Sequence, residues 1–180
     1  MAHGKVLTAV SGGVDSSAAA ALLLEQGYEC LGLFMITHDR AEGALHDAQE
    51  VCKHLGIELQ VEDLRKEFEQ IIAYFVCEYK NARTPNPCVY CNRFVKFGKL
   101  WEIARARGCD HIATGHYARI ETIDGVPCLL QAPNTAKDQS YVLSMIRREV
   151  LGHILLPVAD LTKDQTRKLA GQFGLPTEKK

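Results

Sequence analysis

The sequence predicts an α/β fold in which helices cover both faces of a parallel sheet, and three observations support this prediction. Apolar runs of strand length alternate with segments whose apolar residues recur every three or four positions. The first run is followed by a glycine-rich turn and then by a helical segment rich in alanine and leucine. With 180 residues, 47% of them hydrophobic, the chain can bury one core. We therefore expect a single domain over residues 1–180.

Strands and helices alternate through the first part of the chain. Gly27 and Gly56 are expected to end the first two helices, because glycine readily adopts the left-handed conformation of a helix C-terminus. The polar stretch 37–43 lacks periodicity and is expected to be a loop, and the proline-rich stretch 84–88 disfavours a helix. In order, the expected elements are a strand at 5–10, a helix at 16–26, a strand at 29–35, a helix at 44–55, a strand at 57–61 and helices at 64–76 and 92–107.

The second part of the chain has three clear local signals. Asp124-Gly125 favours the tight turn of a β-hairpin. Thr162 and Gln165 have the spacing of a capping box at a helix N-terminus. The expected elements are a strand at 111–114, a hairpin formed by 117–120 and 126–130, an irregular linker at about 145–160, and a helix from Thr162 that Gly174 and Pro176 end.

Composition narrows the function classes only a little. The formal net charge of -1 shows no basic signature of a nucleic-acid-binding protein, so any RNA contact would need a local patch or another domain. The N-terminus lacks the apolar segment of a secretory signal, and no stretch is long enough to cross a membrane. Seven cysteines, an odd number, fit the reducing cytoplasm better than a disulfide scaffold. We expect a cytoplasmic protein.

The strongest chemical signal is the heptad SGGVDSS, from Ser11 to Ser17, between the first strand and the first helix. Two glycines allow the backbone to approach an anion, and the serines and free amides of the helix N-terminus supply donors. Such a loop suits the phosphates of ATP, and Asp15 would either hold Mg²⁺ or orient the loop. It is not a Walker A motif, which ends in Gly-Lys-Ser/Thr. The alternative is a glycine-rich turn in which Asp or Ser caps the next helix.

A second chemical signal is the pair Cys88-x-x-Cys91, which follows the proline-rich stretch. A helix that starts near Cys91, with Arg93 and Lys96 beside it, would favour the thiolate that sulfur transfer requires. The alternatives are a zinc or iron-sulfur site, a redox dithiol or simple packing. A structural zinc site normally needs two more close ligands, and the sequence contains no second Cys-x-x-Cys.

Several other residues have simpler interpretations. His116 is as readily a structural histidine as a general acid or base, and Arg119 is as readily a solvated charge as a phosphate ligand. Phe97 and Trp101 lie four apart on one helix, a spacing typical of a core face. The remaining five cysteines are expected to pack in or near the core: Cys30, Cys52, Cys77, Cys109 and Cys128.

The heptad resembles the signature of the PP-loop ATP pyrophosphatases, which cleave ATP between its α and β phosphates. The run RTPNPCVYCNR, from Arg83 to Arg93, resembles more narrowly the tRNA 2-thiouridylase (MnmA-like) family. ATGHYAR at 113–119 and AKDQSYVL at 136–143 match the same family, in its order. The least similar stretch is 36–43, where a longer insertion with an aromatic residue is usual. The resemblance implies a PP-loop, adenine nucleotide alpha hydrolase-like fold.

The resemblance also implies an activity: adenylation of O2 of the wobble uridine in tRNA, followed by replacement of that oxygen with persulfide sulfur. Cys91 would be the nucleophile and Asp15 a second catalytic residue, while Cys88 and Cys91 are the candidate ligands of an iron-sulfur cluster or zinc. Some members of the family have Asp at the position of Cys88. ATP with Mg²⁺ would contact Ala9, Val10, Ser11, Gly12, Gly13, Val14, Asp15, Ser16, Met35 and Gly115. The target base or tRNA would contact Asn86, Pro87, Cys88, Lys137, Asp138 and Gln139.

In the family, a second reactive cysteine follows the turn that here lies at Gly174 to Pro176, and barrel domains that help to hold tRNA come after it. The expectation from this sequence is that these barrels are absent from it, and two alternatives follow. Either the chain is a fragment of a longer protein, or sulfur comes from a partner, which would be a sulfur carrier or a cysteine desulfurase relay protein. Two alternatives remain: a nucleotide-binding or sulfur-carrier module with reduced catalysis, and another PP-loop adenylating enzyme.

Overall fold

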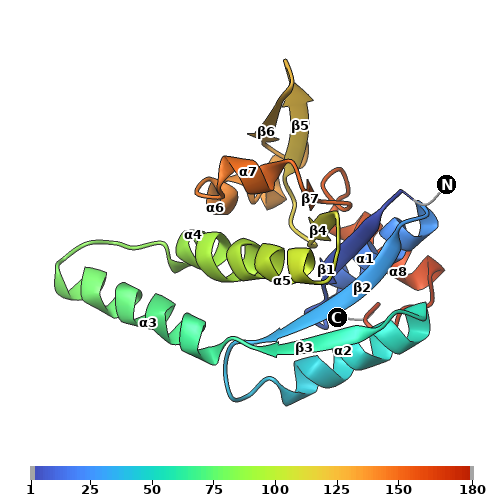
Figure 1. Ribbon diagram of the computed structural model, residues 1–180, viewed down its shortest axis with the longest axis horizontal. Coiled ribbons are helices and arrows are strands. Elements are labelled where there is room, and N and C mark those ends of the chain that lie inside the picture. The colour runs from blue at the N-terminus through green and yellow to red at the C-terminus, as the bar shows by residue number, and fades with distance from the viewer. Residues whose placement is uncertain (1–2, 179–180) are drawn as a thin grey trace.

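A computed structural model describes residues 3–178, and its centre is a five-stranded parallel sheet of order β3-β2-β1-β4-β7. The strands are β1 (Lys5–Ala9), β2 (Glu29–Ile36), β3 (Leu59–Asp63), β4 (His111–Ala113) and β7 (Ile154–Leu155). Figure 1 shows these strands as the layer between helices. The predicted parallel α/β fold is confirmed.

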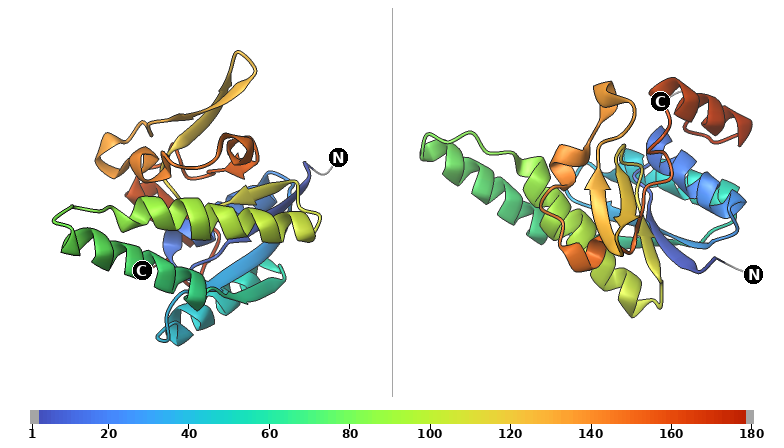
Figure 2. Two further views of the ribbon diagram at one scale, coloured as in Figure 1. Left: turned by 60° about the vertical axis from the view of Figure 1, so that its left-hand side comes forward. Right: turned by 90° about the horizontal axis from the view of Figure 1, so that it is seen from above.

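Alternate residues of the central strand face opposite helical layers. Leu7 lies in the core with Leu33, Phe97 and Leu100, whereas Val6 packs with residues that include Leu23. The first layer therefore contains the long helix made of α4 (Pro87–Tyr90), η1 (Cys91–Lys99) and α5 (Leu100–Ala106). The second contains α1 (Val14–Glu25) and α2 (Glu42–Leu55), and α8 (Lys163–Gln172) packs against α1 (Figure 2).

The long helix begins earlier than the sequence predicted. It consists of α4 (Pro87–Tyr90), the π-helical η1 (Cys91–Lys99) and α5 (Leu100–Ala106), which follow one another without a break. Asn86 caps it by accepting a hydrogen bond of 3.1 Å from the Cys88 N–H, and Pro87 takes the first helical position. Proline is favoured there because its missing N–H would have no intrahelical partner. The expected start at Asn92 is therefore wrong by about one turn.

Helix α3 (Arg65–Lys80) extends away from the sheet, and Figure 1 shows it projecting beside the start of the long helix. Ile71 is its one buried residue. Tyr74 stacks on Tyr90 of α4 at a ring distance of 3.8 Å, which ties α3 to the segment that carries the cysteine pair.

The hairpin of β5 (Arg119–Ile123) and β6 (Val126–Leu130) forms across Asp124-Gly125, both of which have positive φ, as a tight hairpin turn requires. The capping box of Thr162 and Gln165 at α8 is also present.

The segment 145–160, expected to be irregular, contains α7 (Arg148–Leu151) and the edge strand β7. The short elements η2 (Thr135–Lys137) and α6 (Ser140–Leu143) precede it. Within residues 3–178, no helix is both long and apolar enough to cross a membrane.

Candidate nucleotide and thiol site

The heptad forms a tight loop between β1 and α1. Gly12 has a φ of +75°, and a Cβ added there would lie 2.5 Å from the Ala44 carbonyl oxygen, so glycine is required. The hydroxyls of Ser11 and Ser16 lie 3.0 Å apart, and Ser16 also donates to the Gly13 carbonyl at 3.0 Å. Gly13 is the N-cap, and no side chain caps this helix end. The interpretation of the heptad as a turn that Asp or Ser caps is therefore wrong.

Gly115, after β4, lies directly against this loop. A Cβ at Gly115 would lie 2.7 Å from the Ser16 nitrogen and 2.6 Å from the Asp15 carbonyl carbon. Only glycine allows the chain after β4 to pass this close to the start of α1. The two segments, about a hundred residues apart, together shape the loop.

Asp15 does not present a free carboxylate. Lys163 at the start of α8 donates to its two oxygens at 2.7 and 2.6 Å, and the Tyr117 hydroxyl donates to Oδ1 at 2.7 Å. Burial, with a contribution from this hydrogen bond, raises the pKa of Tyr117 above its usual value. In this arrangement the Asp15 carboxylate is the partner of Lys163, and it does not fit the role of a dedicated Mg²⁺ ligand.

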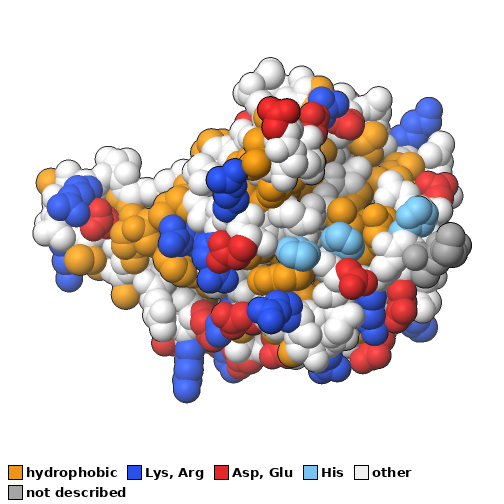
Figure 3. Space-filling model, turned by 45° about the horizontal axis from the view of Figure 1, so that its top comes forward, with side chains coloured by type: hydrophobic (Ala, Val, Ile, Leu, Met, Phe, Trp, Pro, Cys, Tyr) orange, Lys and Arg blue, Asp and Glu red, His pale blue; other side chains and the backbone are white. Residues whose placement is uncertain are grey.

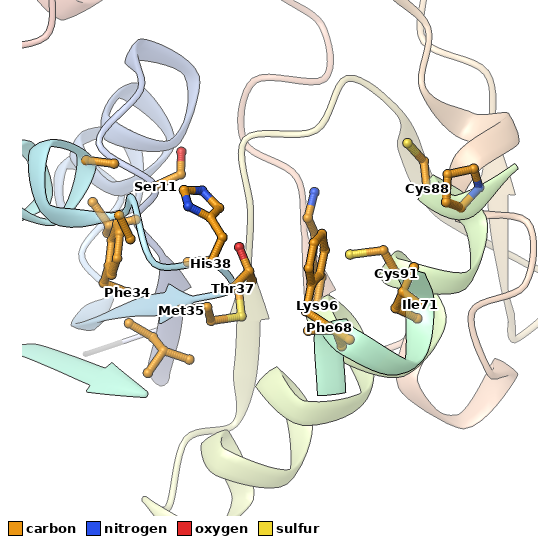
Figure 4. A pocket seen from close by; sticks show the side chains of 17 residues that line it. Ser11, Phe34, Met35, Thr37, His38, Phe68, Ile71, Cys88, Cys91 and Lys96 are labelled. Carbon is orange, nitrogen blue, oxygen red and sulfur yellow. The ribbon is translucent and has the colours of Figure 1, made fainter. Parts of the chain in front are cut away.

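A cavity of about 470 Å³ begins at this loop and extends to the cysteine pair. Figure 4 shows its lining, in which Met35 and Ser11 lie on one side and Cys91 lies on the other with its sulfur directed toward Lys96. Seven of the residues predicted from the sequence line it: Ala9, Val10, Ser11, Met35, Pro87, Cys88 and Cys91. Residues that the sequence did not indicate also line it, among them Phe34, His38, Phe68 and Ile71.

The other predicted residues lie outside this lining. Gly12, Gly13, Val14, Asp15 and Ser16 continue the loop into α1, and Asn86 caps the long helix. Asp138 accepts hydrogen bonds from the Ala132 N–H and the Ser140 hydroxyl, and Gln139 accepts one from the Tyr117 N–H. The side chains of Asp138 and Gln139 thus hold their own loop, and the exposed Lys137 stands beside them on η2.

The thiols of the pair differ in environment. Cys88 is exposed in α4, whereas Cys91 is partly buried one turn later and packs near Ile71 and Val95. Burial raises the pKa of Cys91, Lys96 opposes that rise, and Cys88 adds to it. The predicted depression of the Cys91 pKa is wrong, because Cys91 lies beyond the first helical turn, where the helix field is strongest, and is shielded from water.

The fit of a metal or cluster can be judged from the donor set. Residues 3–178 contain no group of three or more His, Cys, Asp or Glu side chains placed to hold a metal ion. Structural zinc and iron-sulfur sites typically take four protein ligands, so the two thiols of Cys88 and Cys91 do not fit such a group by themselves.

His116 and Arg119 make structural contacts. Burial, reinforced by the positive charge of Lys96, lowers the pKa of His116 to about 3, and its Nδ1 lies 2.8 Å from the Thr114 hydroxyl. Arg119 pairs with Asp160 at 2.5 Å. Lys163 is the residue beside the loop that the sequence did not indicate: the capping box located its helix, but no local pattern shows that its side chain reaches Asp15.

A family model described as the tRNA methyl transferase HUP domain matches residues 4–180. The tRNA-specific 2-thiouridylase MnmA of Pelobacter propionicus is 48% identical over 183 residues, which cover 98% of this chain and 52% of that protein. The chain thus spans about half the length of the curated relatives it matches.

Two solved structures share the fold. One is a 4-thiouridine synthetase–RNA complex with bound ATP, with a TM-score of 0.65 and 18% identity over 97% of this chain and 42% of that one. The other is the U34-tRNA thiolase NcsA of Methanococcus maripaludis with its 4Fe-4S cluster, with a TM-score of 0.63 and 19% identity over 98% of this chain and 59% of that one. The family match and the sequence identity together show that the chain belongs to the tRNA methyl transferase HUP domain family, among the MnmA-like tRNA 2-thiouridylases.

Proposed function

We propose that residues 1–180 form the ATP-binding, adenylating domain of a tRNA 2-thiouridylase. One observation carries the proposal: a single cavity is lined both by the end of β1, where the PP-loop starts, and by Cys88 and Cys91. Its volume of about 470 Å³ lies in the range of small-molecule sites. A nucleotide and a thiol can therefore meet in one space.

The nucleotide would lie with its adenine near Met35 and its phosphates at the loop. The wall around Met35 is apolar, with Leu33 and Phe34 beside it, as suits a purine ring. The first amides of α1, which no side chain caps, favour negative charge at the opposite end. Mg²⁺ would arrive bound to the phosphates of ATP.

The reaction would proceed in three steps. O2 of the uridine attacks the α-phosphorus of ATP, and pyrophosphate leaves. Persulfide sulfur on Cys91 then attacks C2 of the uridine, and AMP leaves with the former O2, so that Cys91 and the uridine are joined through an S–S bond. A second thiol, either the exposed Cys88 or a thiol of the sulfur carrier, attacks the Cys91 sulfur and breaks this bond. The 2-thiouridine leaves, and Cys91 is left in a disulfide with the second thiol. The Cys91 side chain lines the cavity, where positioning against an activated base supplies much of the rate.

The tRNA would approach from the side of the cysteine pair. Pro87 and Cys88 line the cavity, Asn86 precedes them, and Lys137 is an exposed positive charge. Figure 3 shows Lys and Arg interspersed with Asp and Glu on the face drawn there, so this domain would supply only part of the phosphate contacts. A sulfur carrier or cysteine desulfurase relay protein would deliver the persulfide, in the cytoplasm.

A thiolation assay with tRNA, ATP, Mg²⁺ and a persulfide donor tests the proposal. Two products are measured: pyrophosphate released in a tRNA-dependent manner, and 2-thiouridine detected by mass spectrometry of digested tRNA. Wild-type protein should release pyrophosphate, and Cys91→Ser should retain this release while it forms no 2-thiouridine.

The Cys30→Ser variant is the matched control, since Cys30 lies outside the cavity lining. Unchanged 2-thiouridine formation by Cys91→Ser would reject Cys91 as the sulfur-bearing residue. Failure of the wild type to bind ATP would reject the adenylation proposal and favour a module with reduced catalysis.

A further inference from the structure

The side chain of Lys163 reaches the PP-loop from the far end of the chain. Its Nζ atom donates to Asp15 at 2.7 Å from Oδ1 and 2.6 Å from Oδ2, across a separation of 148 residues. Both side chains are about 30% exposed, at 28% for Lys163 and 31% for Asp15. The pair is therefore partly shielded from water and partly accessible to a ligand at the start of α1.

Asp15 by itself would oppose phosphate binding. It is the second residue of α1 and follows the N-cap Gly13, at the end of the helix that we propose faces the phosphates. A carboxylate there would repel the negative charge of a polyphosphate, and an ammonium bonded to both of its oxygens offsets that repulsion. Two of the three ammonium donors point at Asp15, which leaves capacity for a further acceptor.

The position of the ammonium is set by packing as well as by charge. Lys163 is the first residue of α8, directly after the capping box of Thr162 and Gln165. Thr166, one turn later, lies 3.0 Å from the Tyr117 hydroxyl that also donates to Asp15. Further along α8, Ala170 packs in a buried cluster with Val14 of α1. Contacts on both sides of the ion pair thus hold α8 against α1.

We propose that Lys163 is a phosphate ligand of this site, which binds the pyrophosphate part of ATP and stabilises it as it leaves, and that Asp15 is the residue that positions Lys163. This inference rests on the proposed ATP-binding function. Negative charge on the pyrophosphate increases as the bond between the α and β phosphates breaks, and a fixed ammonium at the loop favours that change. Asp15 then acts through Lys163 and does not contact the reacting atoms.

The test measures dissociation constants by calorimetry for Mg·ATP, Mg·pyrophosphate and AMP. Lys163→Met should weaken ATP and pyrophosphate binding by about 10- to 100-fold, the effect of losing one charged hydrogen bond, and leave AMP binding unchanged. Lys163→Arg should retain part of the affinity because it retains the charge. Lys168→Met, which removes an exposed lysine of the same helix, is the control and should bind all three ligands as the wild type does.

The role of Asp15 is tested by a double-mutant cycle. Asp15→Asn should weaken pyrophosphate binding in the wild type, because Lys163 loses the group that positions it, but it should not weaken binding further in Lys163→Met. In Lys163→Met the unpaired Asp15 carboxylate repels pyrophosphate, so Asp15→Asn should leave the affinity unchanged or raise it there. Additive losses would overturn the positioning role. If Lys163→Met fails to fold, Lys163→Gln enters the same measurements.

Equal affinities of wild type and Lys163→Met for ATP and pyrophosphate would overturn the inference about Lys163 and leave the proposed function intact. An equal loss for AMP would also overturn it, since that result indicates a general structural role. By contrast, a wild-type protein that binds neither ATP nor AMP would contradict the proposed function itself.

Discussion

Gly115 lies so close to the first turn of α1 that a Cβ at this position would stand 2.6 Å from the carbonyl carbon of Asp15. No real Cβ tolerates that distance from backbone, so any side chain at residue 115 must displace the PP-loop or β4. The loop geometry therefore depends on a glycine about a hundred residues away, and substitution of Gly115 tests how closely nucleotide binding follows that geometry.

We expect Gly115→Ala to abolish most of the rise in melting temperature that ATP causes, because the alanine displaces the amides at the start of α1. Such overpacking should also lower the free energy of unfolding by about 1–3 kcal/mol. Gly43→Ala is the matched control, since its Cβ would meet nothing within 4 Å in the first turn of α2. That variant should be neutral or more stable by up to about 1 kcal/mol and should keep the ATP effect. An equal rise in melting temperature with ATP in the two variants would show that the close approach of Gly115 to the Asp15 backbone does not affect nucleotide binding.

The raised pKa of Cys91 predicts how its alkylation depends on pH. Because only the thiolate reacts, Cys91 should be modified slowly at neutral pH and should become reactive above the range of a free cysteine, about pH 8.5. Lys96→Met should shift this pH dependence further upward, since Lys96 is the group that lowers the Cys91 pKa. Iodoacetamide rates measured by mass spectrometry check both expectations.

Lys99→Met is the control for loss of a lysine from the same π-helical segment, and it should leave the Cys91 profile unchanged because Lys99 pairs with Glu102. If Cys91 of the ligand-free wild type already reacts fully below pH 7, its thiol is not governed by burial. The same outcome would restore the depressed pKa expected from the sequence.

His116 predicts a loss of stability in mild acid. Its pKa is about 3 in the folded protein and about 6.5 in an unfolded chain, so the unfolded state binds the proton first as pH falls. The stability that the neutral His116 side chain contributes to the folded state is present above pH 6.5 and is lost progressively as the pH falls toward 3. From pH 7 to pH 5 this loss should be about 1–2 kcal/mol.

Urea unfolding at pH 7, 6 and 5 measures this dependence. His116→Asn should make the free energy of unfolding depend less on pH. His46→Gln, at an exposed position in α2, should show the same dependence on pH as the wild type. The same slope in His116→Asn as in the wild type would assign the acid sensitivity to other groups.

Features with local causes could be predicted from the sequence. The strands of the sheet centre were marked by apolar runs, the hairpin by Asp124-Gly125, and the start of α8 by Thr162 and Gln165. Each of these signals depends on residues that are close in sequence, so a pattern can report it. The loop at 11–17 was found for the same reason.

Features that depend on distant contacts could not be predicted. Strand β7 has only two residues, and it is a strand because β4 offers it an edge. Pro87 was interpreted as a helix breaker, although proline serves equally well as a first helical residue when Asn86 supplies the cap. The Cys91 pKa and the Lys163–Asp15 pair both follow from packing between elements far apart in the chain.

Asn86 has two proposed roles that substitution can separate. Its Oδ1 accepts a hydrogen bond from the Cys88 N–H at the start of the long helix, and the family resemblance also places it near the target base. Asn86→Ala should lower the free energy of unfolding by about 1 kcal/mol, the usual effect of a lost cap, whereas Asn86→Ser should keep most of the stability because a serine hydroxyl also caps.

Thiolation activity then distinguishes the roles, since the serine restores the cap but not the amide that would contact a base. If Asn86 acts only as a cap, Asn86→Ser should form 2-thiouridine at the wild-type rate. If it also contacts the base, Asn86→Ser should be stable but slow, with a raised KM for tRNA and an unchanged Kd for ATP. We expect the second result, because Asn86 directly precedes Pro87 and Cys88, which line the cavity. A stable Asn86→Ser variant with full activity would restrict Asn86 to its structural role.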